Sequence, residues 1–158
     1  MKNQSVALFC TIIALSISGL NACGDRPPQD ALDYESCLQM NAAPIQPVPG
    51  EDPHEGVKDV YLCHVDLEEL FDDQGQLIFN YPEGALMVKV SQKEHQSFPW
   101  LMATMRKRDG AWRWAEYTRN FGSEPYIEIP VSESLCIDCH QQAEAIDWVF
   151  TVYSGDRP

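Results

Sequence analysis

The stretch WLMATMRKRDGAWRWAEYT, residues 100–118, decides the fold class of this chain. Two runs in which apolar and polar side chains alternate flank an Asp109-Gly110 pair, the strongest short-range signal for a β-hairpin. The second run is rich in aromatic residues, which are typical of strands. We therefore expect antiparallel strands at residues 100–108 and 111–118.

Working outward, short alternating apolar runs bounded by turn residues predict a sheet rather than a helical bundle. We expect further strands at residues 57–65, 85–90 and 147–153. A short acidic helix is predicted at residues 67–73 and a second helix at 133–145. These elements predict a chain built mainly of strands, two of them paired in a hairpin, with a few short helices.

The charge balance excludes some partners. The chain has 24 acidic and 11 basic residues among 158, which gives a formal net charge of −13. Such acidity disfavours binding to nucleic acid, and to anionic lipid through a basic patch. The length supports one folded domain.

The motif Cys136-Ile-Asp-Cys139-His140 dictates a specific chemistry. In a C-x-x-C-H string the two thiols attach a porphyrin covalently, and the histidine becomes an axial ligand of its iron. On a helix, Cys136 and Cys139 share one face and His140 lies one turn beyond Cys136. We therefore expect one covalently attached haem c with His140 as the metal ligand. A disulfide or half of a zinc site is the alternative, although no second C-x-x-C or His pair completes four zinc ligands.

The N-terminus has the features of an export signal. Lys2 precedes an apolar run at residues 6–17, which is shorter than the roughly 20 residues that span a bilayer. The signal ends in Leu20-Asn-Ala-Cys23, similar to a bacterial lipobox. We expect Cys23 to be lipidated and to anchor the protein in the periplasm, at the outer rather than the inner membrane, through lipid alone. Ordinary cleavage nearby, with Cys23 as a spare thiol, is the alternative.

Two cysteines remain after Cys10 is assigned to the signal, Cys23 to the lipid, and Cys136 and Cys139 to the haem. In an oxidising compartment the leftover pair, Cys37 and Cys63, is most simply a disulfide. The alternative is a metal site that uses Cys63, His64 and His54. Adjacent Cys and His side chains point to opposite sides of a strand, which disfavours that site.

The composition divides the chain into three parts. Residues 1–22 are the expected lipoprotein signal peptide. Residues 23–56 are rich in Pro, Asp and Gln and are expected to form a tether with a short helical turn at 34–40. Residues 57–158 form the expected haem domain.

Several stretches of the chain resemble the cytochrome P-460 family and the related β-sheet cytochromes c′. These are YPEGALMVK at residues 81–89, the hairpin at 100–117, CIDCHQ at 136–141 and DWVFT at 147–151. The resemblance covers about residues 57–153. It implies an α+β, predominantly antiparallel fold, which is a twisted antiparallel sheet with a few short helices around a single pentacoordinate haem. His140 would be proximal, and the other face of the iron would be open. Family members are often dimers, so a homodimer is implied as well.

The resemblance also implies two residues near the open face of the haem. Members that oxidise hydroxylamine cross-link a strand lysine to the porphyrin, and Lys89 lies at that position; Ala85 and Met87 share its face. A solvated sheet-edge lysine is the alternative. Active members also have a distal carboxylate, which an ungapped alignment matches to Met102. Methionine cannot act as a general base, although a register slip of one residue would change the match.

Three functions remain open at this point. The first expectation is a haem protein that binds a diatomic or nitrogen-oxide ligand, for nitric oxide binding, sensing or detoxification. The second is an oxidoreductase that acts on hydroxylamine or nitric oxide and uses a lysine–haem cross-link. The third is an electron-transfer cytochrome c with a redox partner protein.

Overall fold

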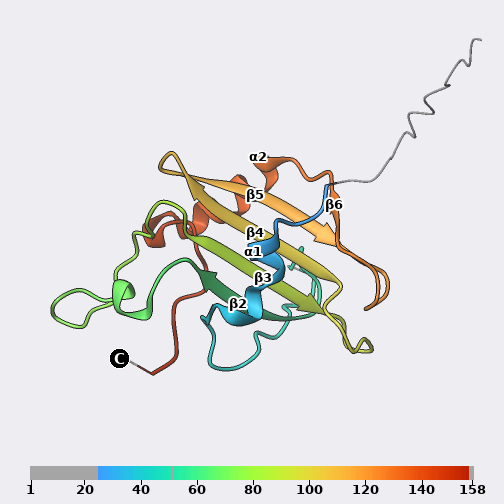
Figure 1. Ribbon diagram of the computed structural model, residues 1–158, viewed down its shortest axis with the longest axis horizontal. Helices are drawn as coiled ribbons and strands as arrows, with labels where there is room; N and C mark the ends of the chain where they lie inside the picture. Colours follow the sequence, from blue (N-terminus) through green and yellow to red (C-terminus); the bar gives the residue numbers. More distant parts are fainter. Residues whose placement is uncertain (1–24, 51, 157–158) are drawn as a thin grey trace, which may run out of the picture.

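One antiparallel sheet organises the protein. The computed structural model describes residues 25–50 and 52–156. In this part of the chain the sheet has the order β1-β2-β3-β4-β5-β6, so each strand lies beside its sequence neighbours (Figure 1). The strands are β1 (Leu38–Gln39), β2 (Val57–Cys63), β3 (Leu86–Gln92), β4 (Leu101–Arg108), β5 (Ala111–Thr118) and β6 (Ile127–Ile129). The predicted α+β, mainly antiparallel class is confirmed.

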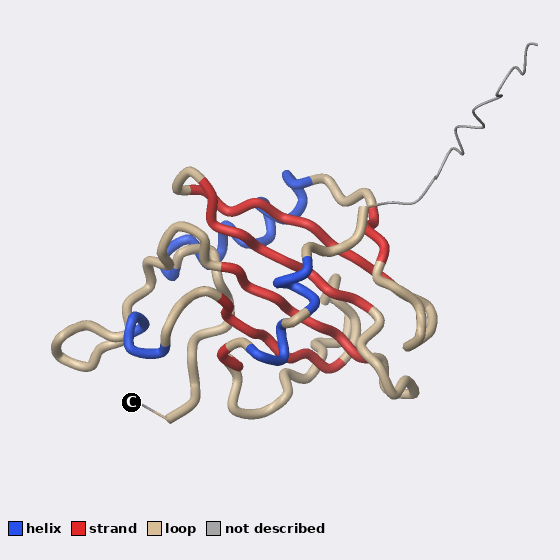
Figure 2. Tube along the Cα trace, viewed as in Figure 1, coloured by secondary structure: helices blue, strands red, loops and turns tan. Residues whose placement is uncertain are grey.

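Short helices flank the sheet, as Figure 2 shows in blue. They are α1 (Gln29–Leu32), η1 (Tyr34–Ser36), η2 (Leu67–Leu70), α2 (Glu133–His140) and η3 (Gln141–Ile146). In Figure 1, α1 lies in front of the sheet, and α2 with η3 lies behind it. No helix among the described residues is both long enough and apolar enough to cross a membrane.

Both faces of the sheet are buried, and each has its own core. On one face Ala31 of α1 packs with Val88 and Met102. On the other face Met87 and Met105 pack with the C-terminal segment. Strand β4 shows the division, because Met102 and Met105 differ in parity and belong to different clusters. Hydrophobic residues therefore occur on both faces of the central strands.

The hairpin is as predicted, but the last predicted strand is absent. Arg108 pairs with Ala111 around Asp109-Gly110. Residues 147–153 form no strand. The reason lies at Asp147 and Trp148, whose φ angles of 52° and 67° are left-handed, so the chain turns there instead of extending.

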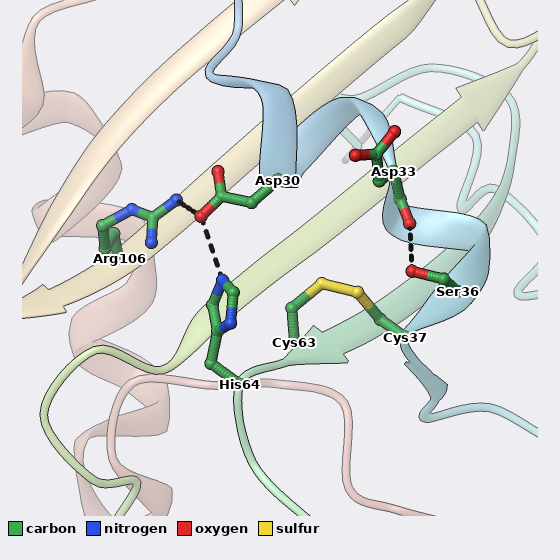
Figure 3. The surroundings of a disulfide bond; sticks show 7 residues. All are labelled: Asp30, Asp33, Ser36, Cys37, Cys63, His64 and Arg106. Atoms are coloured by element: carbon green, nitrogen blue, oxygen red, sulfur yellow. Dashed lines mark hydrogen bonds and ion pairs between the residues drawn. A yellow bond between two sulfur atoms is a disulfide. The ribbon is translucent and has the colours of Figure 1, made fainter.

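The segment expected to be a tether is largely part of the fold. The side chains of Ala31 and Met40 have no exposed surface, and β1 pairs with β2. Cys37 and Cys63 form a disulfide that ties η1 to β2 (Figure 3). The tether prediction is therefore wrong for residues 29–45, because apolar burial and the disulfide hold this segment on the sheet. The residue expected to carry lipid, Cys23, lies outside the described residues.

The alternative metal site is also contradicted. Cys63 is oxidised, and His64 instead binds Asp30, with 2.9 Å between Nε2 and Oδ2. Figure 3 shows this carboxylate shared with Arg106, whose Nη2 donates to the same oxygen at 2.7 Å. The third proposed ligand, His54, lies in a different region. Among the described residues, no three His, Cys, Asp or Glu side chains are grouped so as to hold a metal ion by themselves.

Candidate functional site

A cavity of about 290 Å³ lies between the sheet, α2 and the C-terminal segment. The three residues of the C-x-x-C-H motif, Cys136, Cys139 and His140, all line it, and so does Lys89 from β3. Apolar side chains make up much of the wall, among them Val60, Met87, Met105, Trp114, Leu135, Val149 and Phe150. The fold therefore brings the motif at the end of the chain against the middle of the sheet.

The two motif cysteines are free thiols. Cys136 is partly buried and Cys139 is exposed, and neither is oxidised in the structure. Burial raises the pKa of the Cys136 thiol, so this group is uncharged at neutral pH. Both thiols border the same cavity, as thioether attachment of one group in it would require.

The imidazole of His140 is oriented by a backbone carbonyl. Its Nδ1 lies 2.7 Å from the oxygen of Trp148, and since a carbonyl only accepts, Nδ1 carries the proton. Nε2 is then the unprotonated nitrogen that can bind a metal. Burial lowers the pKa of His140 to about 4, which keeps the ring neutral at pH 7. The rings of Trp114 and Phe150 lie 4.5 and 5.0 Å from it.

A buried ion pair fixes the carbonyl that orients His140. Lys107 Nζ lies 2.6 and 2.8 Å from the carboxylate oxygens of Asp147. The backbone N–H of Tyr81 donates to the same carboxylate, and Trp112 Nε1 donates to the Asp147 carbonyl. Asp147 thus holds the left-handed turn, and Trp148 follows directly.

The register of the sheet places Lys89 on the cavity face and contradicts the expectation that Met102 lies on the same face. Lys89 pairs with Ala103 of β4, and Ala103 pairs with Glu116 of β5. Lys89, Ala103 and Glu116 all line the cavity. Met102 points to the opposite face, where it is fully buried against α1. Side chains alternate between the faces of a sheet at each residue, so Met102 does not share the cavity face with Lys89 and Ala103.

Of the other two residues expected on the Lys89 face, one lines the cavity. Met87 does, whereas Ala85 is fully buried in the same hydrophobic cluster and does not. The predicted parity is therefore correct, although only Met87 and Lys89 of these three residues border the cavity.

Two polar residues complete the site: Glu116, which the sequence analysis did not single out, and His54, which it considered only as a ligand of the alternative metal site. His54 Nδ1 lies 2.6 Å from Lys89 Nζ, and His54 Nε2 lies 2.9 Å from Glu116 Oε1. Burial lowers the pKa of Lys89 to about 8, and the hydrogen bond from His54 lowers the pKa of Glu116. An amine, an imidazole and a carboxylate are therefore joined at one wall of an otherwise apolar cavity.

A signal for Glu116 was present in the hairpin. A two-residue turn at Asp109-Gly110 pairs Arg108 with Ala111, and counting back along both strands places Ala103 opposite Glu116. No comparable signal existed for His54. It lies in an irregular loop whose position depends on contacts with distant strands.

Comparison with known proteins adds no assignment, because no protein-family model and no curated protein matches the chain.

Proposed function

We propose that the protein carries one haem c in this cavity, attached through Cys136 and Cys139, with His140 as the axial ligand. The observation that carries the proposal is the convergence of two free thiols and one oriented, neutral imidazole on a single apolar cavity. The spacing of the motif is that of a c-type haem attachment site. The hydrogen bond from His140 to Trp148 also supports the proposal, because histidines that bind a metal are usually oriented through their second nitrogen.

The residues present fit such a group. The haem would supply an iron centre that binds small ligands and exchanges electrons. The protein's own contribution would be an apolar wall that excludes water, a fixed imidazole, and polar groups at one side. His140 would keep Nε2 directed to the iron through the hydrogen bond of Nδ1 to Trp148.

We propose as first function the binding of a diatomic or nitrogen-oxide ligand, for nitric oxide binding, sensing or detoxification. The polar groups of the cavity are gathered at Lys89, His54 and Glu116, and the rest of its wall is largely apolar. A compact ligand bound to the iron of a haem in this cavity would meet both an apolar wall and hydrogen-bonding groups.

A second function, oxidation of hydroxylamine or nitric oxide, is favoured by Glu116. The sequence match to Met102 weighed against this function because it left no carboxylate for proton transfer. Glu116 lines the cavity on the same face of the sheet as Lys89, so a proton acceptor is available. Met87 and Met105 also line the cavity, and ligation by either sulfur would instead favour an electron carrier.

Attachment is tested by co-expression with a cytochrome c maturation system. We expect haem that survives acid-acetone extraction, and its loss in the Cys136→Ala/Cys139→Ala variant. Cys37→Ser/Cys63→Ser is the matched control, because it removes two cysteines outside the cavity and should retain the haem. Non-extractable haem in the first variant would contradict the assignment.

The spectrum of the ferric and ferrous protein separates the three functions. High-spin iron without a red-shifted Soret band supports ligand binding. A red-shifted ferrous band that disappears in Lys89→Ala supports the cross-linked oxidoreductase. A six-coordinate low-spin spectrum supports electron transfer.

We also propose that the mature protein is lipid-anchored through Cys23 and exposed to the periplasm. The export signal and the disulfide support this location, since disulfides persist in oxidising compartments. The intact mass of the membrane fraction should show a chain that starts at Cys23 with acyl chains added. A soluble product that starts elsewhere would contradict the anchor.

A further inference from the structure

Lys89 and Glu116, the two charged groups at this wall of the cavity, do not lie on neighbouring strands. Lys89 and Glu116 are two strands apart, with Ala103 between them. Neighbouring strands are about 4.8 Å apart, so their backbones are separated by roughly 9.6 Å. A lysine and a glutamate on the same face at this spacing do not meet directly unless both bend towards each other. The methyl group of Ala103 leaves the space above it open.

His54 fills that space and contacts both groups. Glu116 offers an acceptor 2.9 Å from Nε2, so Nε2 carries the imidazole proton. Nδ1 is then a lone-pair acceptor, and Lys89 Nζ donates to it across 2.6 Å. The side chains of His54 and Glu116 are only 12 and 16% exposed. The result is a continuous chain of hydrogen bonds from Lys89 to Glu116.

The loop that carries His54 is held in place at every residue on its C-terminal side. Ser91 Oγ donates to the His54 carbonyl at 3.0 Å, and Trp100 Nε1 donates to the Glu55 carbonyl at 3.0 Å. Gly56 follows with a φ of 111°, and a Cβ there would lie 2.5 Å from the oxygen of Gln92. His54 is therefore placed by the sheet and does not depend on a flexible loop.

A second contact fixes the other side of the loop. Lys58 forms a buried ion pair with Asp52 and also donates to the Gly56 carbonyl at 2.8 Å. Asp52 Oδ1 in turn accepts from the His54 backbone N–H at 3.0 Å. The loop thus has side-chain or backbone partners before, at and after His54.

We propose that Lys89, His54 and Glu116 form a proton relay into the cavity, and that the site serves ligands that exchange a proton when they bind. The ligand class is a neutral weak acid H–X that binds iron as X⁻. This inference rests on the proposed haem. It goes beyond the proposed binding of nitric oxide, which has no proton to give, because it names a second class of ligand and assigns His54 as the linking residue.

The proton transfers balance. Lys89 gives a proton to His54 Nδ1 while His54 Nε2–H gives its proton to Glu116 Oε1. Lys89 is then a neutral amine, His54 is neutral in the other tautomer, and Glu116 is protonated. The amine takes the proton of H–X, which restores the ammonium and leaves X⁻ in the cavity. No net charge is created, and no oxidant or reductant is needed.

The other charged or titratable groups near the relay support its direction. The charges of Asp52 and Lys58 offset each other, because the two side chains form an ion pair beside the loop. Cys139 and His140 also line the cavity, and both belong to the proposed haem site. Glu116 is therefore the carboxylate that lines the cavity and receives the proton.

Cyanide is the probe that tests the relay. Hydrogen cyanide is neutral at pH 7 and binds ferric haem as its anion, whereas carbon monoxide binds ferrous haem without a proton. We expect His54→Gln to slow cyanide association by about 10²-fold and to leave carbon monoxide binding unchanged. Glutamine keeps a donor and an acceptor but cannot transfer a proton by switching tautomers. Glu116→Gln should cause a similar loss, and the double variant little more.

His64→Gln is the matched control. His64 also pairs with a carboxylate at 2.9 Å, Asp30, but does not line the cavity. It should leave both rates unchanged. Unaltered cyanide association in His54→Gln, or an equal loss for cyanide and carbon monoxide, would overturn the relay.

A second measurement separates failure of the relay from failure of the proposed haem. Long-range ¹H–¹⁵N spectra report the tautomer of His54 in the diamagnetic carbon monoxide complex, or in the protein as purified if no haem is attached. We expect the Nε2–H tautomer in wild type and a mixture of both tautomers in Glu116→Leu/Lys89→Met, which removes the acceptor at Nε2 and the donor at Nδ1. A His54 tautomer that is independent of both Glu116 and Lys89 would contradict the relay whether or not haem is present.

Discussion

Lys107 Nζ contacts both carboxylate oxygens of Asp147, at 2.6 and 2.8 Å, and this pair fixes the turn whose next carbonyl orients His140. The two side chains are only 10 and 12% exposed. The ion pair thus links β4 of the sheet to the C-terminal segment that closes the cavity.

Breaking this pair should destabilise the fold strongly. Lys107→Met leaves the Asp147 carboxylate buried without its cation, and we expect a loss of about 3–5 kcal/mol in the free energy of unfolding, measured in urea. Lys93→Met is the control, because the Lys93–Glu55 pair is 38 and 68% exposed and should contribute less than about 1 kcal/mol. Equal effects of the two substitutions would show that Asp147 is not anchored by its charge partner.

Lys89 should lower stability at neutral pH. Its pKa falls from 10.5 to about 8 on folding, so between these values the unfolded chain binds more protons than the folded chain. The unfolding free energy therefore rises with pH across this window, and the cost below pH 8 is about 3 kcal/mol at most. We expect Lys89→Met to be more stable than wild type at pH 7, with the difference disappearing towards pH 10.5.

Urea unfolding of both proteins from pH 7 to pH 10 measures this difference. Tyrosine ionisation at the alkaline end affects both proteins alike and cancels in the comparison. Lys93→Met, at an exposed lysine, should show no such dependence. A Lys89→Met protein that is less stable than wild type at pH 7 would show that the ammonium is well compensated in the fold.

Met102 should not tolerate a carboxylate. Its side chain is fully buried on the α1 face, so Met102→Glu would place an acid in an apolar core, with an expected loss of about 3 kcal/mol or more. Met102→Leu conserves volume and should cost less than about 1.5 kcal/mol. A stable Met102→Glu protein with altered ligand binding would contradict the observed register.

The disulfide should stabilise the segment that packs on the sheet. Cys37 and Cys63 are 26 residues apart, and the chain-entropy model gives about 3.5 kcal/mol for closing such a loop. We expect a loss of this size in Cys37→Ser/Cys63→Ser, measured by urea unfolding. Reductant should lower the stability of wild type by a similar amount and leave the variant unchanged.

Local patterns in the sequence were sufficient for the hairpin, the disulfide and the motif. Asp109-Gly110 determines the pairing of β4 with β5 because a two-residue turn permits one register. The pairing of Cys37 with Cys63 follows from counting thiols in a chain with an expected export signal. The site residues Cys136, Cys139 and His140 follow from spacing within one helix.

The face that each strand presents to the cavity was decided only by the tertiary structure. Both faces of the sheet are buried, so apolar residues such as Met102 and Met105 occur at either parity and alternation no longer identifies the inner face. The packing of residues 29–45 was hidden for a related reason, because its few apolar residues are buried by partners far away in sequence.

The sequence by itself therefore determined the antiparallel class, the hairpin register and the three residues of the C-x-x-C-H motif. The tertiary structure alone decided that Glu116 rather than Met102 borders the cavity and that His54 links Glu116 to Lys89. The physical reason is the distance along the chain over which each kind of interaction acts. Turn chemistry and helical spacing act over a few residues, whereas the loop that carries His54 is held by hydrogen bonds from Ser91 and Trp100, which lie 37 and 45 residues further along the chain than their partners.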